Sequence, residues 1–163
     1  MSTVHCYTNS QRLIDFAHTD LRRARAAAVN IVPTSSDAIE AIDDVLPELA
    51  GRIAGIAYRV PVPDGSLLDL SVELRTEPAL AEVAEAFRRA SQGELAGILA
   101  VTDEELVSSD FIGRSESAVI DLPLLAALDR RLFRVVAWYD NEWGYTHRLA
   151  DLLAWMGQHG ESS

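Results

Sequence analysis

The sequence has 163 residues, of which 48% are apolar and 24% are charged, and its formal net charge is −11. This size and apolar content fit one globular domain that buries about 70% of its unfolded surface. The excess negative charge would repel phosphodiester backbones and anionic lipids, so we expect neither a nucleic acid nor a membrane as the partner.

The chain opens with "TVHCYT" at residues 3–8, whose alternation predicts a short strand, and residues 9–30 are polar and Arg-rich, which predicts a long ordered loop. Because successive strand side chains project to opposite faces, we expect Cys6 to be a buried core thiol on the face opposite His5. A single cysteine excludes an internal disulfide and a Cys-rich metal site, and we predict no metal. With no signal peptide and no apolar run of membrane-spanning length, we expect a cytoplasmic protein.

The middle of the chain alternates between helical and strand patterns. After Ser36, apolar residues recur at helical spacing as far as Leu49 and predict a helix of about three turns. Residues 55–60 and 67–74 have strand patterns, and the Pro-Asp-Gly turn between them predicts antiparallel pairing. Residues 78–91 form a second amphipathic pattern, so we predict a helix that stops at Gly93.

The last third predicts strands near 97–101, 117–121 and 132–138, followed by a helix from about Tyr145 to Met156. We expect its apolar side chains to face inward and the tryptophans to be packing residues: Leu149, Leu152, Leu153 and Met156, and Trp138, Trp143 and Trp155. Together the elements predict an α+β fold, with one domain over residues 1–157 and a polar tail over 158–163.

Four segments carry a family resemblance: "TVHCYTNSQRLIDFAHTDLRRARAAAVNIVPTSS", "AYRVPVPDGSLLDLSVEL", "LVSSDFIG" and "VVAWYDNEWGYTHRLADL". In order and spacing they resemble the catalytic, C-terminal domain of glyceraldehyde-3-phosphate dehydrogenase. The resemblance runs from about Thr3 to Met156. It implies a mostly antiparallel sheet with helices packed on one face, whose open face meets a cofactor domain.

The resemblance also implies roles for individual side chains. His5 matches the histidine that turns the nucleophilic cysteine into a thiolate and then exchanges a proton with the hemithioacetal oxygen, tasks that suit an imidazole whose ordinary pKa is about 6.5. Thr8 and Arg59 match the residues that bind the substrate's phosphate, and Arg23 lies in the same loop and could assist. A small anionic ligand is therefore a possible partner.

The second anion site and the cofactor site are also implied by the resemblance. Ser36 falls where a threonine hydroxyl serves a site for inorganic phosphate, and Asn141 and Tyr145 match the residues that hold the nicotinamide amide. Beside Ser36, however, the sequence has Asp37 and Glu40. At about 4 Å, two like charges repel by roughly 1 kcal/mol in water and about 4 kcal/mol at an effective dielectric of 20, so we expect this site to be impaired.

Two parts of the family's machinery have no match in these residues. The cysteine nucleophile lies before the first strand in the family, and the Gly-rich dinucleotide fingerprint is also absent. We therefore expect no cofactor in this chain alone and NAD only with a complementing partner chain. Two alternatives remain open: a repurposed acyl-transfer or hydrolytic enzyme that uses His5 as general base, and a non-catalytic binding or scaffolding module that forms a homo-oligomer through the open sheet face.

Overall fold

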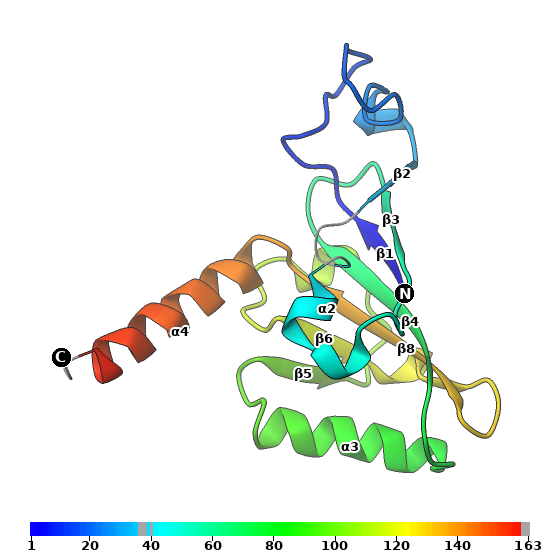
Figure 1. Ribbon diagram of the computed structural model, residues 1–163, viewed down its shortest axis with the longest axis vertical. Helices are drawn as coiled ribbons and strands as arrows, with labels where there is room; N and C mark the ends of the chain where they lie inside the picture. The colour runs from blue at the N-terminus through cyan, green and yellow to red at the C-terminus, as the bar shows by residue number, and fades with distance from the viewer. Residues whose placement is uncertain (36–38, 40, 161–163) are drawn as a thin grey trace.

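The computed structural model describes residues 1–35, 39 and 41–160, which form an α+β fold around one eight-stranded, mostly antiparallel sheet (Figure 1). The strand order is β2-β3-β1-β4-β8-β6-β5, and β7 pairs with β8. Only the β1–β3 and β5–β6 pairs of these strands are parallel. The strands are β1 (Ser2–His5), β2 (Val32–Thr34), β3 (Ile56–Arg59), β4 (Ser66–Glu73), β5 (Leu99–Thr102), β6 (Ala118–Asp121), β7 (Ala126–Ala127) and β8 (Leu132–Tyr139). The helices are α2 (Ile42–Val45), α3 (Leu80–Gln92) and α4 (Trp143–His159).

Helix α3 covers one face of the sheet, as its amphipathic pattern predicts. Its apolar stripe, which includes Val83 and Phe87, packs against a core formed by β4, β6 and β8, with Val135 and Ala137 buried at its centre. The helix begins where the backbone N–H of Ala79 donates to the Glu82 carboxylate (2.7 Å), and it ends before Gly93. This layer fixes the centre of the sheet.

The predicted pairing of the strands on either side of the Pro-Asp-Gly turn is wrong. Strand β1 lies between β3 and β4, parallel to β3 and antiparallel to β4. The connection over residues 60–65 is long enough to cross β1. It also forms a hydrogen bond with the end of that strand, in which the Val60 N–H donates to the His5 carbonyl (2.9 Å). The first strand of the chain therefore becomes an interior strand, and its side chains face those of β3.

The helix predicted after Ser36 is not continuous over the described residues. Ile39 is helical and Ala41 lies in a turn, and the helical turn over Ile42–Val45 is followed by a 3₁₀ turn over Pro47–Leu49. Pro47 has no N–H to continue the α-helical hydrogen bonds, which explains the break. The predicted site residue Ser36, together with Asp37 and Glu40, lies outside the described residues.

The last helix forms, but its apolar side chains do not face inward. Helix α4 extends away from the sheet toward the C-terminus (Figure 1), and its second half packs on no other element of the described structure. The exposed side chains are Leu149, Leu152, Leu153, Trp155 and Met156, with exposed fractions from 43 to 69%. Trp143 is also 48% exposed, so of the three predicted packing tryptophans only Trp138 packs, stacked on Phe111 with centroids 5.2 Å apart.

The wrong expectation for α4 has a physical cause. An apolar stripe on a helix indicates that this side of the helix is to be buried, but it does not show which segment buries it. No segment in the described part of the chain does so. None of the helices over these described ranges has the length and apolarity needed to cross a bilayer.

Candidate functional site

His5 and Arg59 are brought together by strand register. They are directly paired residues of the parallel strands β1 and β3, so their side chains lie side by side on one face of the sheet. They line a cavity of about 360 Å³ whose other wall is the segment from Tyr139 to Arg148, which leads from β8 into α4. Asn141 and Tyr145 line the same cavity. Four of the predicted site residues therefore share one cavity.

Two groups compete for Nδ1 of His5. Arg59 Nη1 lies 2.5 Å from it and can only donate, whereas the Cys6 carbonyl lies 2.8 Å from it and can only accept. The contact with Arg59 requires an Nδ1 without hydrogen, and in that tautomer the neutral ring holds its proton on Nε2. Burial is the main cause that lowers the pKa of His5, and the positive charge of Arg59 lowers it further, against the opposing effects of the Cys6 carbonyl and Asp64. The imidazole is thus a neutral group at neutral pH.

Arg59 is a half-buried cation at the edge of this cavity. Its Nη1 also donates to the Cys6 carbonyl (3.1 Å), and over the described ranges of the chain it forms no ion pair with a carboxylate. Burial lowers the pKa of Arg59, and the positive charge of Arg23 acts in the same direction, although the group stays protonated in water. A partly desolvated guanidinium without a counter-ion favours an anionic ligand.

Cys6 is buried as predicted, with 2% of its surface exposed, but it does not face away from His5. Its Sγ lies 3.5 Å from His5 Nδ1 and donates to Asn141 Oδ1 at 3.1 Å. The expectation fails because β1 ends at His5, so the alternation of a strand does not extend to Cys6. Burial raises the pKa of the thiol, which makes it a neutral hydrogen-bond donor rather than a nucleophile.

The turn from β8 into α4 orients the cofactor-site candidates. The Asp140 carboxylate is 4% exposed and accepts hydrogen bonds from the backbone N–H groups of Gly113, Glu142 and Trp143 (2.7–2.9 Å). Burial alone would raise the pKa of Asp140, but these three bonds outweigh it and the pKa is lowered. Asn141 Oδ1 accepts from both Cys6 and Ser66 (3.1 and 3.2 Å), which fixes its side-chain amide at the cavity wall.

Thr8 is not brought to Arg59's cavity. It lines a separate cavity of about 650 Å³ formed by the start of the Arg-rich loop, and its hydroxyl lies 3.0 Å from that of Ser10. The predicted pair of substrate-phosphate residues is therefore divided between two neighbouring cavities.

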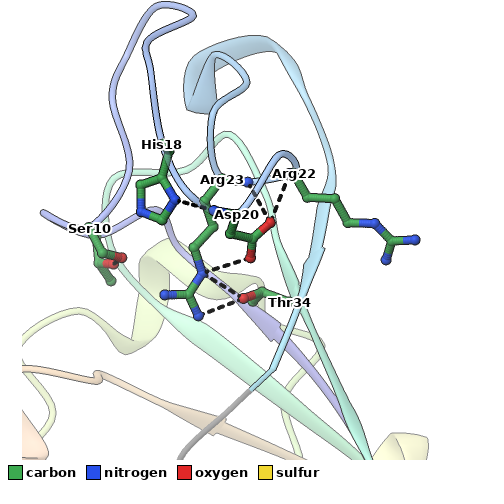
Figure 2. A network of polar contacts seen from close by, with 7 residues as sticks. Ser10, His18, Asp20, Arg22, Arg23 and Thr34 are labelled. Atoms are coloured by element: carbon green, nitrogen blue, oxygen red, sulfur yellow. Dashed lines mark hydrogen bonds and ion pairs between the residues drawn. The ribbon is translucent and has the colours of Figure 1, made fainter.

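Arg23 belongs to a polar network that holds the loop against β2 (Figure 2). Its Nε and Nη2 both donate to Thr34 Oγ1 (2.9 and 2.7 Å), and Nε lies 3.5 Å from Asp20. His18 accepts from the Asp20 backbone N–H (2.9 Å), while the Arg22 guanidinium points away from the cluster. Arg23 therefore has structural partners, and its predicted assistance to a ligand would require it to leave them or to act through its charge.

Sequence reasoning missed several residues that build the site, among them Tyr139, Asp140 and Ser66. Tyr139 lies edge-on to His5, with ring centroids 6.1 Å apart, and burial raises its pKa to about 12. An aspartate shortly before a helix is a capping signal, so the sequence could have indicated Asp140, which lies three residues before α4. Tyr139 and Ser66 have no such signal. Across the described part of the chain, no three His, Cys, Asp or Glu side chains gather as a metal site would require.

Comparison with known proteins gives consistent results. Residues 1–141 match the family described as glyceraldehyde 3-phosphate dehydrogenase, C-terminal domain. The chain is 48% identical over 157 residues to glyceraldehyde-3-phosphate dehydrogenase 2 of Streptomyces avermitilis, covering 96% of this chain and 47% of the relative. It is 49% identical over 160 residues to the Geobacillus stearothermophilus dehydrogenase, covering 98% and 48%, and 49% identical over 158 residues to that of Mycobacterium tuberculosis, covering 97% and 46%.

The chain thus spans about half the length of the curated relatives that it matches. The matched family model covers most of its residues, and the α+β fold with its mostly antiparallel sheet agrees with the expected architecture. This protein belongs to the glyceraldehyde 3-phosphate dehydrogenase C-terminal domain family.

Proposed function

We propose that this chain provides the substrate half of an NAD-dependent aldehyde dehydrogenase site, and that a partner chain supplies the cysteine nucleophile and the NAD-binding domain. The observation that carries the proposal is the cavity that joins His5, Arg59, Asn141 and Tyr145. It combines an imidazole, an amide and a cation that has no carboxylate partner among the described residues, which are the groups that a phosphorylated aldehyde and a carboxamide-bearing cofactor would need.

Each group has a task that follows from its chemistry. As the imidazolium, His5 can donate its Nε2 proton to an oxygen that becomes negative, and the neutral imidazole that remains after the transfer is a base. Arg59 attracts the substrate's phosphate through the guanidinium nitrogens that His5 does not use. Asn141 would hold the carboxamide of a nicotinamide, because its carbonyl oxygen is already occupied by Cys6 and Ser66 and its amide nitrogen is left for a ligand. NAD, when bound, would accept the hydride of the aldehyde.

Helix α4 supports the presence of a partner chain. Its exposed apolar residues, such as Leu153 at 69% and Trp155 at 58%, form a surface that water solvates poorly. The chain spans only about half the length of its relatives, and a partner that resembles their other half would have the size needed to cover this surface.

The test is complementation in trans. The part of the Geobacillus dehydrogenase that lies outside the matched region is expressed, mixed with this chain, and assayed for NADH formation from glyceraldehyde 3-phosphate, NAD and phosphate. We expect a complex by light scattering and measurable turnover that falls about 10²- to 10⁴-fold in H5Q, the usual contribution of a general acid–base group. The matched control is R130M, which changes an exposed arginine far from the cavity. A mixture that forms no complex would refute the proposal.

A second candidate is a non-catalytic binding module, and the exposed face of α4 favours it as well. The open sheet face is a weaker candidate surface, because β4 and β8 present there the exposed Asp69–Arg134 ion pair (2.8 Å) rather than an apolar patch. Self-association of this chain through α4 would then be the expected property. Light scattering of the isolated chain distinguishes the two: a concentration-dependent dimer that L153Q disrupts favours the module, and a monomer contradicts it.

A further inference from the structure

The contact between Arg59 and His5 couples an anion-binding group to a proton-exchanging group. One guanidinium nitrogen, Nη1, is shared between His5 Nδ1 (2.5 Å) and the Cys6 carbonyl (3.1 Å). The same carbonyl lies 2.8 Å from His5 Nδ1. His5 Nδ1 therefore faces one donor and one acceptor, and it cannot use both at once. When it has no hydrogen it accepts from Arg59, and when it is protonated it must donate to Cys6 and repel Arg59.

The remaining nitrogens of Arg59 leave a place for an anion. Over residues 1–35, 39 and 41–160, Nε and Nη2 of Arg59 donate to no acceptor. These two nitrogens lie on the edge of the guanidinium that can donate to two oxygens of one anion at once. A tetrahedral dianion bound there would pull the guanidinium away from Nδ1 and cancel much of its charge. Both effects favour a proton on Nδ1, where the Cys6 carbonyl already stands as acceptor.

We propose that His5 and Arg59 form an anion-linked proton switch. In this switch a tetrahedral dianion on Arg59 releases His5 Nδ1, which takes up a proton from solvent, and the new Nδ1–H donates a hydrogen bond to the Cys6 carbonyl. The proposal rests on the anion-binding role given to Arg59 above. His5 is a neutral Nε2–H donor in the empty site and an imidazolium in the anion-bound site. Binding of the substrate's phosphate would thus protonate His5, the general acid of the reaction.

The surroundings of the pair allow the switch. The charged or titratable groups near it are Asp64 in the connection after β3, Cys6 after β1, Tyr139 on β8 and Arg23 in the loop. From the turn and α4, Asp140, Tyr145 and Arg148 line the same cavity. Tyr139 and Cys6 are neutral at neutral pH because burial raises both of their pKa values. Asp64 favours the imidazolium, whereas Arg59 opposes it, and the lowered pKa of His5 shows that Asp64 does not outweigh burial and Arg59 in the empty site.

The experiment is a nitrogen NMR titration of the full chain with labelled histidine rings, with H5Q used to assign the His5 signal among the four histidines. The probe is sulfate, because its charge is constant over the pH range in which histidine titrates, and chloride at equal ionic strength is the control. Without sulfate we expect the Nε2–H form. Sulfate should raise the protonation midpoint of His5, and by reciprocity sulfate should bind about fivefold or more tightly when His5 is protonated.

Three variants and three outcomes decide the proposal. R59M should lose the sulfate response of His5, R130M should keep it, and, if R59M does not fold, R59K should show a response at least about fivefold weaker because it lacks the fork. An Nδ1–H form without sulfate overturns the switch. Sulfate that shifts the Arg59 Nε signal but leaves His5 unchanged also overturns it, while the anion site of the proposed function stands. No sulfate binding at Arg59 overturns both.

Discussion

Alkaline unfolding should reveal the buried phenol of Tyr139. Its pKa is raised to about 12 from an ordinary value of 10, mainly by burial and against the opposing effects of Ser66 and Arg59. In the folded state the proton is held more tightly, so the resulting stability is fully present below about pH 10 and is lost as the pH rises toward about 12. A two-unit difference gives a loss of about 1 kcal/mol by roughly pH 11 and of roughly 2 to 3 kcal/mol at the upper limit.

This chain suits the measurement because it contains no lysine, whose ammonium groups would otherwise titrate in the same pH range. Urea unfolding would be measured at about pH 8 and about pH 11 for wild type, Y139F and C6S. The C6S variant removes the thiol, whose pKa is also raised and which would add to the alkaline loss. The quantity compared is the change in the free energy of unfolding between the two pH values, and not its absolute value.

Y139F should lose about 1 kcal/mol less than wild type over this interval, because it has no phenol to ionise. A matched variant, Y145F, removes an exposed phenol and should retain the wild-type dependence. Equal pH dependence in Y139F and wild type would refute the reasoning that burial holds Tyr139 protonated.

Three further predictions concern acid stability, the turn into α4, and α4 itself. Because the pKa of His5 is lowered in the folded state, the unfolded chain takes up a proton first as the pH falls below about 6.5. The wild type should therefore lose thermal stability as the pH falls toward the lower folded-state pKa. H5Q should lose less thermal stability over the same pH interval. D140A should lower the free energy of unfolding in urea by about 1 to 3 kcal/mol or more, because three backbone N–H groups lose their acceptor; a change within about 0.5 kcal/mol would contradict the capping role. L153Q should change the free energy of unfolding of the isolated chain by no more than about 0.5 kcal/mol, whereas F133A in the core should lower it by about 3 to 5 kcal/mol. A large effect of L153Q would show that α4 packs within the chain.

The local patterns predicted most of the elements. The helix over residues 78–91 and the strands near 97–101, 117–121 and 132–138 lie where periodicity placed them, because each buries one apolar face against the same core. Strands β2 and β7 were missed because three and two residues are too short to show a period.

The site was predictable only as a set of candidates. His5, Arg59, Asn141 and Tyr145, four of the candidates, line one cavity, but Thr8 lines another cavity and Arg23 has partners in Thr34 and Asp20. The pattern of a strand predicts the face of a side chain only while the strand continues. It therefore failed at Cys6, one residue after β1 ends.

The sequence by itself determined the family and the α+β class and named His5 and Arg59 as candidates, since these depend on residue types in fixed order. The tertiary structure decided three other matters: β1 enters between β3 and β4, Arg59 donates to His5 Nδ1, and the apolar side of α4 stays exposed. Each of these depends on which distant segments meet in space. A periodic pattern of apolar residues indicates that one side of a helix or strand is to be buried. Only the packing of the whole chain shows whether the chain itself buries that side.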